Sequence, residues 1–128
     1  MTRYLIDTHT AMWFFNGDIK LSKAANDIIY DFSNPIYLSI ASAWEVAIKL
    51  RIGKLDIVSN TADFLRDAET NKIIILPIVP ASLTVLETLP MIHRDPFDRL
   101  LIATAIAEQM TLISADTNIS QYKVSHIW

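Results

Sequence analysis

The chain has 128 residues, of which 52% are hydrophobic and 20% charged, with two glycines and no cysteine. A chain of this length has room for one domain with one core, and the lack of cysteine excludes disulfides, thiolate metal sites and cysteine nucleophiles. The formal net charge of −3 argues against a wide basic face that binds nucleic acid by phosphate neutralisation alone. We therefore expect a single domain, residues 1–128, that folds in a reducing cytoplasm.

The apolar content is high for so small a chain. The mean hydropathy of +0.29 indicates an apolar surface that a partner protein covers. The first residues, MTRYLID, lack the long apolar core and the small-residue cleavage site of a signal peptide. The uncharged run from Ile73 to Leu86 is too short for a bilayer and is interrupted by Pro77 and Pro80, so we expect no transmembrane helix.

Short apolar runs alternate along the chain with longer segments of helical composition, most of which begin at a Ser, Asn, Asp or Pro start signal. In chain order, the predicted elements are strand Tyr4–Ile6, helices Thr8–Phe15 and Leu21–Phe32, strand Ile36–Leu38, helices Ile40–Ile52 and Asn60–Asn71, strand Ile73–Leu76, helices Ala81–Leu89 and Pro96–Met110, and strand Leu112–Ser114. The short apolar runs are typical of strands that are covered on both faces. The alternation predicts an α/β fold, a three-layer sandwich with a central, mostly parallel sheet of four to five strands flanked by helices.

Two acidic residues come after predicted strands. Asp7 follows the first strand directly, and Asp116 comes shortly after the last one. In open parallel sheets, ligand and metal sites gather at the carboxyl ends of the strands, so we expect both carboxylates at the same edge. Each also has a simpler interpretation, because Asp7 could cap the helix that begins at Thr8 and Asp116 could cap the turn Thr117–Ile119.

Two further acids lie inside predicted helices. Glu45 lies four residues before Lys49, and this spacing alone favours a surface ion pair between the two side chains. Asp98 shares its helix face with apolar residues such as Leu101 and has no cation one turn further on, which is unusual for a carboxylate. Asp95, which is followed by proline, is the expected N-cap of this helix, so Asp98 is left free to bind a ligand.

If these four acids converge, their mutual repulsion favours a bound multivalent cation. Carboxylate oxygens select hard cations such as Mg2+ or Mn2+. A metal held in this way lowers the pKa of a bound water and neutralises charge during hydrolysis of a phosphodiester. The pattern therefore indicates a site for phosphodiester hydrolysis that contains Asp7, Glu45, Asp98 and Asp116.

Four segments of the chain, in order, resemble the PIN-domain family. They are LIDTHT around Asp7, ASAWEVAIK around Glu45, HRDPFDRLLIATA around Asp98, and LISAD ending at Asp116. The WEVAIK helix and the HRDPFDRLLIA stretch resemble in particular the VapC toxins of bacterial and archaeal type II toxin–antitoxin pairs. The resemblance covers nearly the whole chain.

The resemblance implies a PIN fold and a Mg2+- or Mn2+-dependent endoribonuclease that acts on RNA in the cytoplasm. It also implies a homodimer that is inhibited by a cognate VapB-like antitoxin. Matched by position, Asp7, Glu45, Asp98 and Asp116 are implied to be the catalytic residues and the metal ligands. Asp95 belongs to the matching stretch and is expected just outside the metal ligands.

Other functions fit these residues less well. Haloacid-dehalogenase phosphatases need a second Asp two residues after the first, where this chain has His9. A phosphorelay receiver needs adjacent acids near the end of the first strand, and Asp7 stands alone. The remaining alternative is a catalytically inactive PIN-like module that binds RNA or protein, and the intact acidic quartet argues against it.

Several neighbouring side chains have expected supporting roles. Thr8 and Ser114 are the hydroxyls expected to hold Asp7 and Asp116 by hydrogen bonds. Arg99 is expected to orient Asp95 or Asp98. The histidines are too scattered for a zinc motif and are given no role; they are His9, His93 and His126. Core packing is the expectation for four aromatic residues: Trp13, Phe14, Phe15 and Trp44.

Overall fold

A five-stranded sheet forms the centre of the fold. The computed structural model describes residues 1–128. The strands, in the order in which they lie side by side, are β3 (Ile74–Leu76), β2 (Ile36–Ser39), β1 (Tyr4–Ile6), β4 (Thr111–Ile113) and β5 (His126–Ile127). Every neighbouring pair of strands is parallel. The predicted parallel sheet is confirmed.

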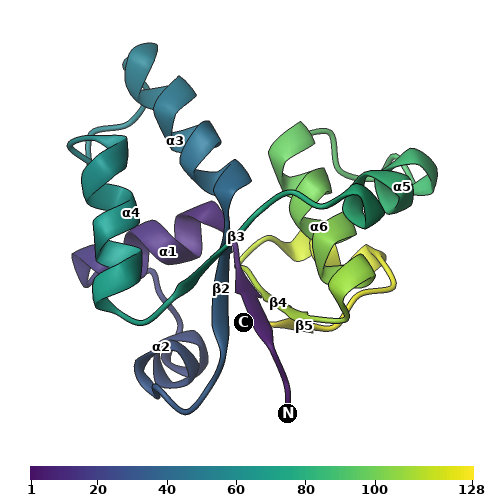
Figure 1. Ribbon diagram of the computed structural model, residues 1–128, viewed down its shortest axis with the longest axis horizontal. Coiled ribbons are helices and arrows are strands. Elements are labelled where there is room, and N and C mark those ends of the chain that lie inside the picture. The colour runs from purple at the N-terminus through teal and green to yellow at the C-terminus, as the bar shows by residue number, and fades with distance from the viewer.

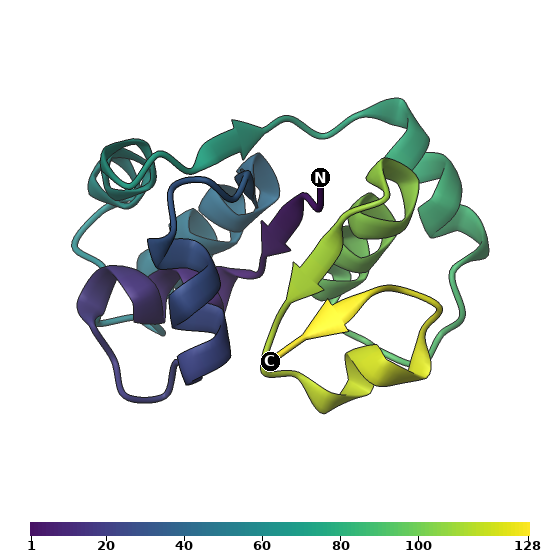
Figure 2. The same ribbon diagram turned by 90° about the horizontal axis from the view of Figure 1, so that it is seen from below.

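Helices cover both faces of this sheet. They are α1 (Thr8–Asn16), α2 (Lys23–Tyr30), α3 (Ile40–Arg51), α4 (Thr61–Thr70), α5 (Pro80–Thr88) and α6 (Pro96–Glu108). The first four lie on one side of the strands and α5 and α6 on the other (Figure 1), and Figure 2 shows the same two groups from below. The three-layer sandwich is therefore confirmed. None of these helices combines the length and the apolar composition that a membrane span requires.

The strands are apolar on both faces, which explains why both need a layer of helices. Leu5 and Leu112 belong to one buried core, together with Leu101 of α6. Ile6 and Ile113, the next residue of each strand, belong to the other core, which the helices from α1 to α4 complete. Successive side chains of a strand point to opposite faces, so one short strand supplies both cores.

The fifth strand is the element that the sequence did not reveal. β5 contains only His126 and Ile127, which is too short for a periodic pattern. The predicted elements otherwise differ from the observed ones at their ends. The helix predicted for Leu21–Phe32 is Lys23–Tyr30, because the side chain of Ser22 accepts a hydrogen bond from the backbone of Ala25 and so caps the first turn.

The sheet extends from the central strand, β1, to both sides. β2 and β3 extend the sheet on one side of β1, and β4 and β5 extend it on the other. In such sheets a crevice for ligands forms at the carboxyl ends of the strands where the strand order reverses, which here lies between β1 and β4. Asp7 follows β1, and Asp116 follows β4 after a short connection through Ser114, so both acids reach this crevice.

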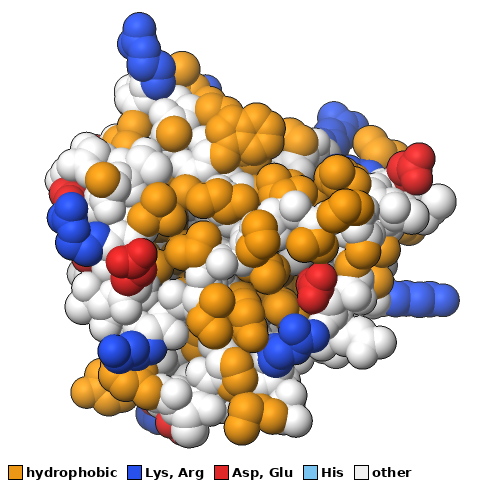
Figure 3. Space-filling model, in the orientation of Figure 1, with side chains coloured by type: hydrophobic (Ala, Val, Ile, Leu, Met, Phe, Trp, Pro, Cys, Tyr) orange, Lys and Arg blue, Asp and Glu red, His pale blue; other side chains and the backbone are white.

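One face of the molecule is largely apolar. Figure 3 shows hydrophobic side chains gathered across its middle, where Figure 1 places β3 between the two groups of helices. α3 and its C-cap residue carry an exposed apolar stripe with a spacing of four residues, which consists of Ile40, Trp44, Ile48 and Ile52. Trp44 is 57% exposed and its ring packs edge-on against Phe97. The expectation that Trp44 lies in the core is wrong, because Ala43 and Val46 occupy the core-facing side of α3.

Candidate active site

The first acid, Asp7, is buried at the junction of β1 and α1. Its Oδ1 accepts a hydrogen bond from the Thr10 backbone N–H at 2.8 Å, so Asp7 is the N-cap of α1. Its Oδ2 accepts a hydrogen bond from Ser114 Oγ at 2.5 Å. Asp7 also lines a cavity, so the capping role and a ligand role are compatible in one rigid carboxylate.

Asp116, which follows β4, also caps a turn with one carboxylate oxygen and contacts another side chain with the other. Its Oδ1 accepts a hydrogen bond from the Asn118 backbone N–H at 2.9 Å and caps a 3-10 turn, Thr117–Gln121. Its Oδ2 lies 2.5 Å from Nε2 of His93. Burial acts to raise the pKa of Asp116, but the hydrogen bonds from Asn118 and His93 outweigh burial and hold the pKa below its usual value.

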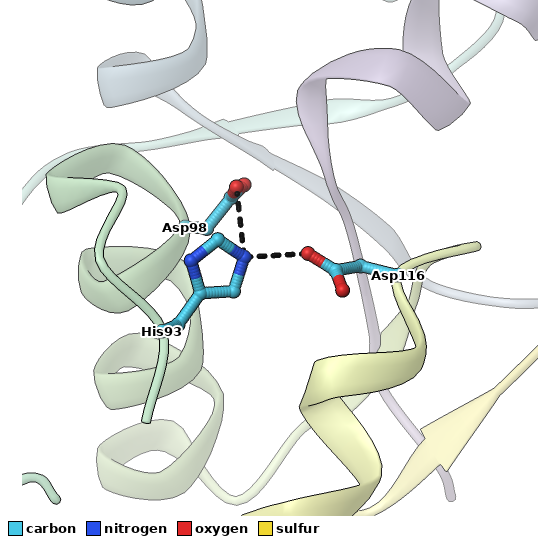
Figure 4. Close-up of side chains that lie close together, drawn as sticks. All are labelled: His93, Asp98 and Asp116. Atoms are coloured by element: carbon cyan, nitrogen blue, oxygen red, sulfur yellow. Dashed lines mark hydrogen bonds and ion pairs between the residues drawn. The ribbon is translucent and has the colours of Figure 1, made fainter. Parts of the chain in front are cut away.

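The imidazole ring of His93 lies between two carboxylates (Figure 4). Its Nε2 lies 2.5 Å from Asp116 and 3.3 Å from Oδ2 of Asp98. Its Nδ1 accepts a hydrogen bond from the Asp95 backbone N–H at 3.1 Å, so the proton of the neutral ring lies on Nε2. These three side chains have the spacing of a metal site, but an Nε2 that donates a hydrogen bond is not free to bind a cation. We interpret His93 as the donor that holds the two acids in place.

His93 is a site residue that was not identified from the sequence. The available signal was local, since His93 lies in the HRDPFD stretch, two residues before the N-cap Asp95. Sequence spacing could not show that the loop brings the ring to Asp116, which lies 23 residues further along the chain.

Two buried side chains fix the loop that carries His93. Arg99 of α6 donates to the carbonyl oxygens of Leu89 at 3.2 Å and Pro90 at 2.8 Å, and it reaches that of His93 at 3.5 Å. The hydroxyl of Tyr122 accepts a hydrogen bond from the His93 backbone N–H at 2.7 Å and donates to the Pro90 carbonyl at 2.8 Å. The expectation that Arg99 orients Asp95 or Asp98 is wrong, because all its hydrogen bonds go to this loop.

Asp98 lies in the first turn of α6 and is partly buried. As predicted, Asp95 is the N-cap of this helix, and its Oδ1 accepts a hydrogen bond from the Asp98 backbone N–H at 3.2 Å. Burial is the largest influence on the Asp98 carboxyl, followed by the negative charges of Asp95 and Asp7, with a smaller one from Glu45. Together they raise its pKa from 3.8 to about 7, although His93 acts in the opposite direction. The positive charge around Asp98 is therefore too small to stabilise its ionised form.

Glu45 is almost fully buried on α3. Its Oε1 accepts a hydrogen bond from Thr8 Oγ1 at 2.7 Å, and its Oε2 pairs with Nζ of Lys49 at 2.6 Å. The expected ion pair is present, but it is not a surface pair, because the glutamate is buried. Burial acts to lower the pKa of Lys49, but the hydrogen bond and charge of Glu45, with the charges of Asp95 and Asp98, outweigh burial and raise it. Lys49 therefore stays charged beside Glu45.

Of the two supporting hydroxyls, Ser114 contacts both of the expected acids, whereas Thr8 contacts neither. Ser114 donates to Asp7 and accepts from the backbone N–H of Asp116 at 3.1 Å. Thr8 donates to Glu45 rather than to Asp7. The reason is that β4 lies beside β1, which places Ser114 next to Asp7, whereas the side chain of Thr8 is turned toward α3.

A cavity of about 300 Å³ opens beside these acids. It is lined by Asp7, His9, Trp13, Asp98, Ala115 and Asp116. Three of the four acids singled out in the sequence therefore share one cavity. Glu45 is not part of the lining, but its charge acts on Asp98. The structure thus brings together residues that lie far apart in the sequence, and it surrounds the cavity with carboxylate oxygens.

Comparison with known proteins identifies the family of the chain. Residues 4–125 match the family model described as PIN domain. The chain is similar to Ribonuclease VapC22 of Mycobacterium tuberculosis, with 28% identity over 130 residues that cover 96% of this chain and 94% of the relative. It is also similar to the solved structures of VapBC2 from Rickettsia felis bound to a promoter DNA fragment (TM-score 0.74, 13% identity, 98% of both chains) and of a toxin–antitoxin complex from Klebsiella pneumoniae (TM-score 0.64, 17% identity, 98% of this chain and 96% of that one). Because the family model covers nearly the whole sequence and the fold agrees, the chain belongs to the PIN-domain family.

Proposed function

We propose that this PIN domain is a metal-dependent endoribonuclease and acts as the toxin of a toxin–antitoxin pair. The observation that carries the proposal is the convergence of Asp7, Asp98 and Asp116 on one cavity, with Glu45 close enough to affect Asp98. The similarity to a ribonuclease, VapC22, supports RNA as the substrate. An intact set of acids at this position argues against an inactive binding module.

We propose Asp7, Glu45, Asp98 and Asp116 as the catalytic residues, which would together hold Mg2+ or Mn2+. The donor set fits such an ion, because carboxylate oxygens are the ligands that hard cations select. The raised pKa of Asp98 fits as well, since a nearby cation would relieve the excess negative charge. When bound, such an ion supplies Lewis-acid stabilisation of the phosphate and activates a water for hydrolysis.

The chain's own residues hold these carboxylates in position before any ligand binds. Ser114 fixes Asp7, and His93 fixes Asp116. A hydroxyl and an ammonium group hold the two oxygens of Glu45. Preorganised groups of this kind cost no rearrangement during the reaction. The acids can therefore keep one geometry while an RNA phosphate enters the cavity.

We further propose a cognate VapB-like antitoxin as a protein partner and a homodimer as the state of the toxin. The toxin–antitoxin complexes among the structural neighbours support the antitoxin. The exposed apolar stripe on α3 supports the homodimer, because small soluble proteins rarely leave such a surface open to water. An RNA-cleaving toxin of this type would act in the cytoplasm, where its substrate is found.

The test is cleavage of RNA by the purified protein in Mg2+, in Mn2+ and in EDTA. Asp7→Asn and Asp98→Asn each remove one ligand charge and should lower the cleavage rate about a hundredfold or more. Asp67→Asn makes the same chemical change on an exposed residue of α4 and is the matched control. Cleavage that persists in EDTA, or equal cleavage by the wild type and both site variants, would contradict the proposed mechanism.

A further inference from the structure

An aromatic row lies beside the cavity of the acids, and it consists of His9, Trp13 and Trp128. The ring centroids of His9 and Trp13 lie 5.7 Å apart, and those of Trp13 and Trp128 lie 5.8 Å apart. His9 and Trp13 line the cavity itself. All three rings remain in contact with solvent: His9 is exposed, Trp13 is half-buried and Trp128 is 37% exposed. Large aromatic rings are usually buried, so an open row at this place needs an explanation.

The charges around the cavity do not attract RNA. Three of its lining residues are acidic, and none is lysine or arginine. Two basic side chains close to the acids are engaged with other groups, since Lys49 pairs with Glu45 and Arg99 binds backbone carbonyls. The chain as a whole has a net charge of −3. Phosphate neutralisation by the protein therefore contributes little, and a nucleic acid that binds here needs contacts that do not depend on charge.

We propose that the aromatic row is a subsite for one unpaired nucleobase of the RNA substrate. This inference rests on the proposed ribonuclease function, because the same cavity would hold the scissile phosphate. Stacking of a base on an aromatic ring supplies binding without any charge. The row begins in the cavity at His9 and Trp13, so a nucleotide whose phosphate lies near Asp7 can place its base on these rings.

The geometry of the row indicates how the base binds. The neighbouring rings are in direct contact and are tilted by 46° and 56° to one another, so a base stacks on the free face of one ring and does not insert between two. His9 is the exposed end of the row and offers that face, while Trp128 contacts the ring of Trp13. Trp128 is thus a positioning residue for the platform.

This subsite would select RNA by its structure. A base inside a duplex is stacked on both faces, so it reaches a protein ring only when it is unpaired or splayed out. Every base has a π-face, so the subsite tolerates sequence differences. The preferred substrate is therefore a single-stranded, looped or bulged segment.

The experiment measures binding apart from cleavage. The anisotropy of a labelled, short single-stranded RNA is followed in EDTA and in an Asp98→Asn background, so that neither a metal nor hydrolysis contributes. The same RNA with one abasic nucleotide, moved through each position in turn, and an RNA duplex are the comparison ligands. The protein variants are His9→Ala, Trp13→Leu and Trp13→Phe. Tyr30→Leu removes a ring that is 75% exposed on α2, outside the cavity, and is the matched control.

We expect His9→Ala and Trp13→Leu to weaken binding of the single strand about tenfold, which is the usual effect of losing one stacked base. Trp13→Phe, which keeps a ring, and Tyr30→Leu should bind like the parent. One abasic position should weaken binding by the parent by a similar factor and should have little further effect on His9→Ala. Binding that is equal for His9→Ala, Trp13→Leu and the control overturns the proposal. His9 is exposed, so its variant keeps the test valid even if Trp13→Leu unfolds.

Cleavage in Mn2+ separates this inference from the proposed function. If the base stacks equally well in the bound state and in the transition state, loss of the His9 ring raises KM and leaves kcat unchanged. If the wild type cleaves RNA and His9→Ala has the same KM, the proposed subsite is contradicted and the proposed nuclease function is not. If no preparation cleaves RNA but base-dependent binding is lost in His9→Ala, the proposed nuclease function is contradicted and the proposed base subsite is not.

Discussion

The substitution Asp98→Asn is expected to stabilise the metal-free protein, and the gain should grow with pH. Burial and neighbouring acids raise the pKa of Asp98 from 3.8 to about 7 in the folded state. Between these two values the folded chain keeps a proton that the unfolded chain has lost. The stability that this proton supplies is fully present below about pH 4 and is lost as the pH rises through about 7. Asparagine does not ionise, so the variant escapes this loss.

The size of the effect follows from the two pKa values. At about 1.4 kcal/mol for each tenfold change in proton concentration, the difference between 3.8 and about 7 corresponds to about 4 kcal/mol. The Asp98 side chain is 27% exposed, and screening by solvent reduces the effect to about 3 kcal/mol. Asparagine also removes a negative charge from the first turn of α6, which costs about 0.3–1 kcal/mol. We therefore expect a net gain of about 2 kcal/mol in the free energy of unfolding at about pH 8.

The assay is urea unfolding in EDTA, measured at intervals from about pH 4.5 to about pH 8. The stability difference between Asp98→Asn and the wild type should increase up to about pH 7 and then level off. Glu87→Gln, which neutralises an exposed acid on α5, is the control and should show no such increase. The reasoning is refuted if Asp98→Asn is no more stable than the wild type at about pH 8, or if the difference does not change with pH.

Three further substitutions test other parts of the structure. His93→Phe keeps a ring but removes the donor to Asp116, so the affinity for Mn2+ measured by titration calorimetry should fall about tenfold or more, and an unchanged affinity would contradict the positioning role. Arg99→Leu removes the side-chain donor to the Leu89 and His93 carbonyls, while the Pro90 carbonyl keeps its hydrogen bond from Tyr122. The free energy of unfolding in urea should fall by about 2 kcal/mol; a loss of less than about 1 kcal/mol would show that water replaces these hydrogen bonds. Trp44→Glu places a charge in the apolar stripe of α3 and should shift the sedimenting species from dimer to monomer. A wild type that already sediments as a monomer would contradict the homodimer.

The fold class and most of the helices and strands could be predicted because they depend on local patterns. Apolar runs such as Tyr4–Ile6 are too short for helices, and start signals such as Asp95-Pro96 mark where helices begin. The position of Asp7 after a strand and the absence of a nearby cation beside Asp98 were visible in the sequence for the same reason. Only β5 escaped, since two residues carry no periodicity.

The partners of the site residues could not be predicted, because tertiary contacts choose them. Ser114 lies beside Asp7 only because β4 pairs with β1. His93 reaches Asp116 only because buried side chains fix its loop. The capping role and the site role of Asp7 also looked like alternatives in the sequence, whereas in the fold one oxygen caps the helix and the other accepts from Ser114.

The central claim is that these carboxylates form one metal site, and the position of Mn2+ in a crystal tests it most directly. Anomalous scattering from a crystal saturated with Mn2+ locates the ion independently of any assay for cleavage. We predict a peak in the cavity, with oxygens of Asp7, Asp98 and Asp116 at about 2.0–2.6 Å. A cavity that stays without a peak at saturating Mn2+, or an ion bound only to surface acids such as Asp63 and Asp67, would contradict the proposed metal site.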